Sequence, residues 1–215
     1  LVVIIGSLVA LQPDIGTLGI IAITALILYF LGGGKIYQLA TLTFLGFAVF
    51  YFLVQLAPYR LARILVFFNP GTDAQGIGYQ INQALIAIGS GGFWGLGLGR
   101  GLQKYHYLPE PMGDSIFAIF AEEMGLMGSL VLIAVFLFFC SRGFFIAKRA
   151  PDQFGRLLAS GITISITLQA FINMAAISGL LPLTGIPLPF ISYGGTSLAL
   201  TLTSVGVLFN ISKYI

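Results

Sequence analysis

Long apolar stretches recur along this chain, and they constrain its fold more than any other feature. Each is close to the about 20 residues that an α-helix needs to cross a bilayer, and short polar or Gly/Pro-rich segments separate them. The stretches run over Ile15–Leu31, Ile36–Ala57, Ser115–Phe139, Leu157–Leu181 and Thr196–Ile211. Only 8% of the residues are charged, against about a quarter in soluble domains. The pattern therefore predicts an all-α polytopic membrane protein.

Two further segments complete the expected topology. Leu1–Leu11 is apolar but short, so we interpret it as the outer end of a sixth transmembrane helix whose start precedes this sequence. Residues 58–113 form a long segment with a short helix candidate, Tyr79–Ile88, and a run of glycines from 89 to 99. Backbone this rich in glycine is tolerated near a membrane only against protein or a water-filled cavity. We therefore expect a re-entrant or interfacial helix there, within a single integral membrane domain that covers residues 1–215.

The distribution of basic residues predicts how the spans are oriented. Six of the ten lie on one side of the predicted spans, in short turns and in a loop expected at Ser141–Arg156: Lys35, Arg142, Lys148, Arg149, Arg156 and Lys213. Short cytoplasmic loops carry such an excess. Gln12–Asp14, the 58–113 segment and Pro182–Gly195 then all face outward, and we place the functional surface there. A net charge of +3 is too small to favour a nucleic-acid partner.

Asp114 stands where a polar segment becomes an apolar helix. It is either a helix N-cap, a position that Asp favours, or a general base that takes a proton from a substrate hydroxyl. The two roles are compatible, because a carboxylate at the positive end of a helix stays ionised. Glu122 and Glu123 follow at membrane depth, where acids are costly unless they are used. Because they lie on different faces of a helix, we expect one to be structural and the other, which we take to be Glu122, to face a cavity.

Three other polar residues each have two interpretations. Glu110, between two prolines, either steers a sugar or a cation or is a solvated loop charge. Asp14 either binds the long outer segment or forms a structural turn. His106 is the only histidine, which argues against a metal site built from protein side chains and favours a surface histidine.

Four cations lie on the side that the basic bias disfavours: Arg60, Arg63, Arg100 and Lys104. They either contact lipid head groups or clamp a lipid phosphate or pyrophosphate, whose oxygens suit the fork of an arginine. Because cations on that side need an anion, we favour the clamp. Residues 181–195 contain three prolines and three glycines, which fits the rigid wall of a groove better than a flexible connector.

These stretches resemble the SEDS proteins (shape, elongation, division and sporulation), the RodA/FtsW group of bacterial membrane glycosyltransferases. The matching stretches are QPDIGT at 12–17, RLARILVFFNP at 60–70, GYQINQALIAIGSGGFWGLGLGRGLQKYHYLPE at 78–110, DSIFAIFAEEMG at 114–125 and GLLPLTGIPLPFISYGGTS at 179–197. They run through almost the whole chain in family order. The QKxxYLPE motif at 103–110 looks more like the division branch, FtsW, than like RodA.

The resemblance implies a ten-helix fold, of which this chain would be the C-terminal part. It implies polymerisation of lipid II into peptidoglycan strands at the outer face of the bacterial cytoplasmic membrane, for cell division or cell shape. It places the family's essential aspartate on Asp114, followed by Ser115 where a bulky apolar residue is usual. The implied partner is a class B penicillin-binding protein. Gln103, Ser192 and Tyr193 lie in the matched stretches and join Glu110 and the four cations as candidate substrate-binding residues.

We therefore expect Asp114 to deprotonate an acceptor sugar hydroxyl. Arg60, Arg100 and Lys104 would stabilise the polyprenyl pyrophosphate leaving group, with Mg²⁺ or Mn²⁺ as a candidate bridging ion. Two rival functions remain open. A flippase for the same lipid would also use intramembrane acids, but it should carry polar residues on both sides of the midplane. A non-catalytic scaffold that recruits a transpeptidase is the second rival.

Overall fold

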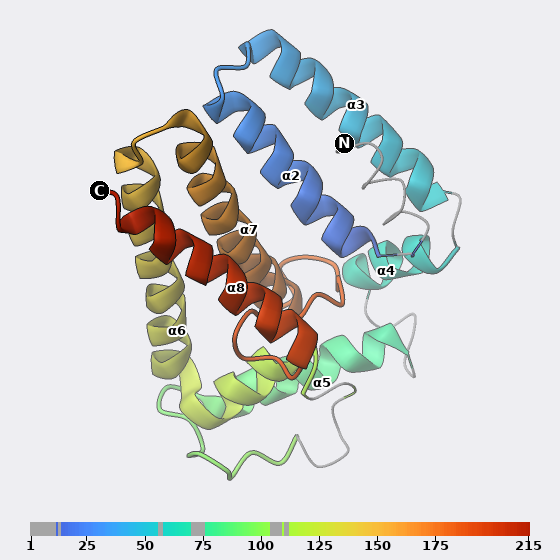
Figure 1. Ribbon diagram of the computed structural model, residues 1–215. Coiled ribbons are helices and arrows are strands. Elements are labelled where there is room, and N and C mark those ends of the chain that lie inside the picture. The colour runs from blue at the N-terminus through green and yellow to red at the C-terminus, as the bar shows by residue number, and fades with distance from the viewer. Residues whose placement is uncertain (1–11, 13, 56–57, 70–75, 104–108, 110–111) are drawn as a thin grey trace. The chain divides into compact units, whose positions relative to one another are not determined.

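The computed structural model of the protein describes residues 12, 14–55, 58–69, 76–103, 109 and 112–215. Within these ranges every regular element is an α-helix (Figure 1). The helices are α2 (Ile15–Leu31), α3 (Ile36–Gln55), α4 (Pro58–Phe68), α5 (Ile77–Gly91), α6 (Ile116–Arg149), α7 (Gln153–Ile177) and α8 (Gly195–Ser212). The predicted all-α fold is confirmed. The helix predicted from Leu1–Leu11 lies outside the described residues.

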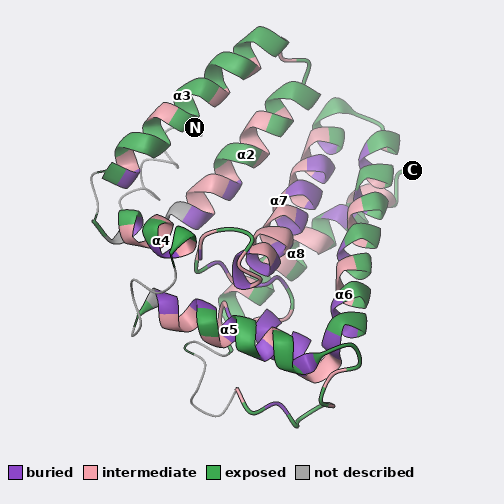
Figure 2. Cartoon of the chain, turned by 180° about the vertical axis from the view of Figure 1, so that it is seen from behind, coloured by how far each residue is buried: buried purple, intermediate pink, exposed green. Residues whose placement is uncertain are grey.

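Four of these helices, α3, α6, α7 and α8, are long and apolar enough to cross a membrane. α2 is equally apolar but has 17 residues, which is at the short end for a span. α3 is exposed along most of its length (Figure 2), as expected of an apolar helix whose solvent is lipid. The helix candidate Tyr79–Ile88 lies within α5, whose 15 residues are too few to span.

The basic loop predicted at Ser141–Arg156 is mostly helical instead. α6 continues to Arg149 and α7 begins at Gln153. The physical reason lies at Phe145, because the guanidinium groups of Arg142 and Arg149 lie 5.0 and 4.2 Å from the centroid of its ring. Residues three and four positions apart are neighbours on a helix, and a cation over an aromatic ring is favourable. These contacts carry the helix beyond the apolar stretch.

The chain forms two compact units. The first comprises residues 1–57, 138–168 and 199–215, and the second comprises residues 58–137 and 169–198. In the first unit α2 packs on α7, since a Cβ added at Gly161 would lie 3.1 Å from the side chain of Leu28. α6 approaches α7 closely where Gly143 meets Thr163. Small residues permit such approach between helices in a membrane. That the chain is one membrane domain stays a prediction.

The second unit has its own apolar core, to which α4, α5, α6, α7 and the loop after α7 all contribute. The helical members include Val66, Ile81, Ala84, Phe117 and Met174. Leu183 and Leu188 of the loop are 6% and 1% exposed. Part of the loop Pro182–Gly195 is therefore packed into this core, and that it forms the wall of a groove stays a prediction.

α6 is broken at Gly125, where φ is 65° and ψ is −166°. The backbone of residues 92–97, in the glycine-rich segment after α5, fills the break. Four hydrogen bonds of 2.9–3.2 Å close it: Leu96 N to Glu122 O, Gly97 N to Glu123 O, Leu126 N to Gly92 O and Met127 N to Phe93 O. A helix break otherwise leaves backbone groups unpaired, which costs several kcal/mol each in hydrocarbon.

The span predicted over Ser115–Phe139 lies within α6, which is long and apolar enough to cross a membrane, but it is not one continuous helix because it is broken at Gly125. The piece of α6 that precedes Gly125 lies beside α5 (Figure 1), and the piece that follows runs on to Arg149. Glycine is required on both sides of the contact, because a Cβ at Gly95 or Gly125 would collide with the facing backbone. The sequence showed a run of glycines after the predicted helix Tyr79–Ile88 but did not predict its insertion into another helix.

Candidate functional site

Asp114 lies in the turn at residues 112–115, directly before α6. Its Oδ1 atom lies 3.4 Å from Gln80 Nε2 and 3.3 Å from Ser115 Oγ, and both groups donate to it. Gln80 Nε2 also donates to Ser115 Oγ at 3.0 Å. Ser115 is fully buried, so it helps to hold the carboxylate from inside the protein. These bonds fix one oxygen of Asp114.

The second carboxylate oxygen of Asp114 faces Gly185 in the loop after α7. A Cβ added at Gly185 would lie 3.9 Å from Asp114 Oδ2 and 4.0 Å from both Nη atoms of Arg63. An anion and a cation thus adjoin the same small space, which exists because Gly185 has no side chain. Its φ of +72° is in the left-handed region that glycine adopts without strain.

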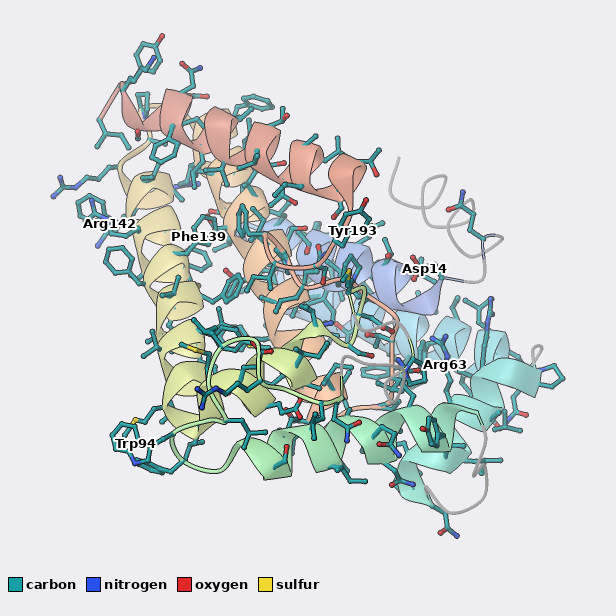
Figure 3. All side chains as sticks on the ribbon, turned by 90° about the horizontal axis from the view of Figure 1, so that it is seen from below. Asp14, Arg63, Trp94, Phe139, Arg142 and Tyr193 are labelled. Atoms are coloured by element: carbon teal, nitrogen blue, oxygen red, sulfur yellow. The ribbon has the colours of Figure 1, made fainter. Side chains whose placement is uncertain are left out.

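Arg63 reaches this space from α4. Its Nη1 atom donates to the carbonyls of Leu183 and Thr184, at 3.4 and 3.3 Å, and its side chain points from α4 toward that loop (Figure 3). Arg60, one turn earlier on α4, is 8% exposed. Both arginines thus lie on α4, three residues apart.

Asn173 of α7 ties the Asp114 turn to the loop. Its Nδ2 atom donates to Asp114 O at 2.8 Å and to Ile186 O at 2.7 Å, and the residue is 1% exposed. Two segments that are far apart in sequence are thereby held by one buried amide. Asn173 and Gln80 were not predicted from the sequence. The available signal was an uncharged polar residue inside an apolar helix, which is costly unless it is hydrogen-bonded.

Ser192 and Tyr193 fasten the far end of the same loop. Ser192 Oγ donates to Gly113 O and accepts from Leu188 N, both at 2.7 Å. Tyr193 N donates to Met112 O at 2.8 Å. The Ser192 hydroxyl thus helps to position the loop, and its contact with substrate stays a prediction. The ring of Tyr193 is 85% exposed and stays a candidate for substrate contact.

The Glu122 carboxylate is structural, contrary to our preference for a cavity role. It is 2% exposed and accepts from the backbone N–H groups of Leu102, at 2.9 Å, and Gln103, at 3.4 Å. It holds the returning end of the glycine-rich segment, which explains why a buried acid is tolerated there. Glu123 is partly buried, and Arg100 is exposed on that segment.

Asp14 belongs to the first unit and caps α2. Its carboxylate accepts from Thr17 N at 3.0 Å and from Thr17 Oγ1 at 2.6 Å, so the structural alternative for this residue holds.

Three of the singled-out residues, Lys104, His106 and Glu110, lie outside the described residues. Over the described ranges no group of three His, Cys, Asp or Glu side chains could hold a metal ion, and we derive no step through one.

Fold and site together define a polytopic membrane protein in which a half-buried aspartate and an arginine adjoin one space beside a packed loop. The FtsW/RodA/SpoVE family, described as cell cycle proteins, matches residues 1–215. The chain belongs to this family, in agreement with the resemblance of its motifs.

Curated relatives match this chain over most of its length. Stage V sporulation protein E of Bacillus subtilis is 46% identical over 203 residues, which cover 94% of this chain and 56% of that protein. The probable peptidoglycan glycosyltransferase FtsW of the same organism is 45% identical over an alignment 221 residues long, which covers 99% of this chain and 55% of that protein. The chain thus spans about half the length of the curated relatives it matches.

Solved structures match the fold as well. A chain from a structure described as the structural coordination of polymerization and crosslinking by a peptidoglycan synthase complex aligns with a TM-score of 0.76 at 25% identity, covering 97% of this chain and 58% of that one. A variant of the rod shape determining protein RodA from Thermus thermophilus aligns with a TM-score of 0.63 at 24% identity, covering 97% and 53%. The second match supports the fold alone.

Proposed function

We propose that the full-length protein is a peptidoglycan glycosyltransferase that polymerises lipid II at the outer face of the bacterial cytoplasmic membrane. The observation that carries the proposal is the space over Gly185, which Asp114 Oδ2 and the Arg63 guanidinium both adjoin. The naming of relatives as probable peptidoglycan glycosyltransferases supports it.

In the proposed reaction Asp114 is the general base. Gln80 and Ser115 donate to Oδ1, and the proton of an acceptor sugar hydroxyl passes to the carboxylate on the side of Oδ2, which lies 3.9 Å from the Cβ position of Gly185. The resulting oxygen attacks the anomeric carbon of a second lipid-linked sugar. The new C–O bond forms as the bond from that carbon to the pyrophosphate oxygen breaks, and the electron pair leaves with the polyprenyl pyrophosphate. The carboxyl group then returns its proton to water.

The leaving group acquires negative charge, which a fixed cation stabilises. Among the predicted cations, Arg63 lies within 4.0 Å of the same Gly185 Cβ position that Asp114 Oδ2 approaches, whereas Arg100 lies on the glycine-rich segment next to Gly97. We therefore assign the pyrophosphate to Arg63, with Arg60 one turn earlier on α4. We also propose the outward orientation and a class B penicillin-binding protein as partner. A Mg²⁺ or Mn²⁺ ion bound with the substrate would add positive charge at the pyrophosphate. The match to a peptidoglycan synthase complex supports the partner.

The test is polymerisation of purified lipid II by the full-length protein, with and without a cognate transpeptidase. We expect Asp114→Asn to lower the rate by about 100-fold or more. The matched control is Asp152→Asn, since Asp152 is a carboxylate that accepts from Gly155 N at the start of α7 and has no role in the proposed chemistry.

Full polymerisation by the Asp114→Asn protein would overturn the proposal. The flippase alternative is tested on the same proteins in proteoliposomes. Transport of lipid II by the wild type without any polymerisation would favour the flippase. A protein that only recruits the transpeptidase would neither transport nor polymerise lipid II.

A further inference from the structure

The first unit contains a cavity at the ends of three helices. It has a volume of about 210 Å³ and is lined by Leu31, Phe144, Ala147, Lys148, Arg156 and Ser160. These residues come from the last turn of α2, the end of α6 and the start of α7. Since α6 and α7 are both long enough to span and are joined by residues 150–152, the cavity lies where two spans leave the apolar layer.

Two cations without anionic partners line this cavity. Within the described residues, neither Lys148 nor Arg156 forms an ion pair, and the neighbouring Asp152 is used to accept from Gly155 N at 3.0 Å. Lys148 suits the C-terminal end of α6, where the helix dipole favours a positive charge. Arg156 lies in the first turn of α7, where the dipole disfavours it. Arg156 therefore lies at an unfavourable position in the absence of an anion.

Three other cations of this unit differ in their surroundings. Arg142 and Arg149 lie over the ring of Phe145, and Lys35 lies 5.8 Å from the centroid of the Tyr37 ring. In the described part of the chain Lys148 and Arg156 have no such ring contact. The two cations that line the cavity thus lack the ring contact that these three cations have.

The walls of the cavity indicate what kind of anion fits. Leu31, Phe144 and Ala147 are apolar, and the Ser160 hydroxyl donates to Arg156 O at 2.8 Å, so recognition falls to the two charges. A volume of about 210 Å³ is below the 300–1,000 Å³ that is usual for drug-sized ligands. It suits a phosphate head group whose attached chains continue along apolar surface. Basic pockets between helices at a membrane boundary recognise anionic lipids in this way.

We propose that this cavity binds the phosphate group of an anionic membrane phospholipid, with Lys148 and Arg156 as the charged contacts. The proposal does not depend on the glycosyltransferase assignment, because the cavity lies in the first unit and Asp114 lies in the second.

The test uses the purified full-length protein and native mass spectrometry with added phosphatidylglycerol or phosphatidylcholine. The double variant Lys148→Gln/Arg156→Gln should retain phosphatidylglycerol about tenfold less well than the wild type, as expected when charged hydrogen-bond donors are lost. The matched control is Arg142→Gln/Arg149→Gln, which removes two charges from the same end of α6 but outside the cavity. It should retain phosphatidylglycerol within about twofold of the wild type.

Each other outcome overturns the proposal. Equal losses of phosphatidylglycerol retention in both double variants would indicate general attraction to the membrane surface. No loss of retention in either variant would show that the cavity does not bind this lipid. Equal retention of phosphatidylcholine would exclude recognition of an anionic lipid. Displacement of phosphatidylglycerol by millimolar inorganic phosphate would assign the cavity to a soluble phosphate instead. Thermal unfolding of both variants checks that they are folded.

Discussion

Asp114 and Arg63 both lie within 4.0 Å of the Cβ position of Gly185. Oδ2 of the aspartate lies 3.9 Å, and the guanidinium nitrogens of the arginine lie 4.0 Å, from the point where a side chain on Gly185 would begin. The two residues come from different elements, α4 and the turn before α6, and a third element, the loop after α7, supplies the glycine. The space that the proposed chemistry uses is thus made by an absent side chain.

Gly185→Ala should therefore impair both folding and activity. The left-handed backbone, with φ of +72°, costs an L-residue about 1–2 kcal/mol, and the new methyl group would occupy the position of the substrate oxygen. We expect lipid II polymerisation to fall by about 100-fold, measured on folded protein. Gly89→Ala is the control, since it lies in α5 with no atom within 4 Å of its added Cβ. Wild-type activity in Gly185→Ala would show that the space is not the reaction site.

Asn173→Ala should act on the rate of the chemical step. The buried amide bonds Asp114 O and Ile186 O, so its loss leaves two carbonyls unsatisfied at a cost of about 2–3 kcal/mol. Because Asn173 positions the aspartate and is not assigned a contact with the substrate, kcat should fall while KM for lipid II changes little. The exposed Asn210→Ala serves as control. A rise in KM without a fall in kcat would contradict the positioning role.

Gly125→Ala should strongly destabilise the protein. The added methyl group would lie 2.8 Å from Phe93 O and would force out the backbone that closes the broken helix. We expect a loss of about 3 kcal/mol or more in the free energy of unfolding, detected by thermal unfolding in detergent. Gly206→Ala in α8, which has open space around it, should be neutral or slightly stabilising. Equal stability of the two variants would show that the insertion is not tight.

Glu122→Gln tests whether Glu122 contributes to stability rather than to catalysis. Its carboxylate accepts from two backbone N–H groups, and the amide would bring a donor against them, at a cost of about 1–3 kcal/mol. We expect lower thermal stability but polymerisation within a few-fold of the wild type per folded molecule. The neighbouring Glu123→Gln is the comparison. A loss of activity as deep as that of Asp114→Asn, without loss of stability, would return Glu122 to the reaction site.

The apolar stretches predicted the spans well because the bilayer requires about 20 apolar residues per helix, whatever the tertiary contacts. The bounds of α2 agree with Ile15–Leu31. The break at Gly125 could not be predicted in this way, since an isolated glycine is tolerated in a helix and the backbone that fills the break lies some 30 residues earlier in the chain.

The site was predictable where charge made a residue costly, and less so elsewhere. Asp114 and Arg63 were singled out because ionised groups near lipid need a purpose. Gln80 and Asn173 carry no charge and were missed, although they hold Asp114. The choice of Arg63 over Arg100 for the leaving group required the packing of α4 on the loop after α7, which spacing in the sequence does not specify.

The break in α6 has a mechanical consequence for Asp114. The 92–97 backbone is bonded to Glu122 and Glu123 before the break and to Leu126 and Met127 after it. These bonds hold both pieces to one segment. A change in bilayer thickness, which a helix meets by tilting, would therefore move the turn of Asp114 together with the start of the longer piece.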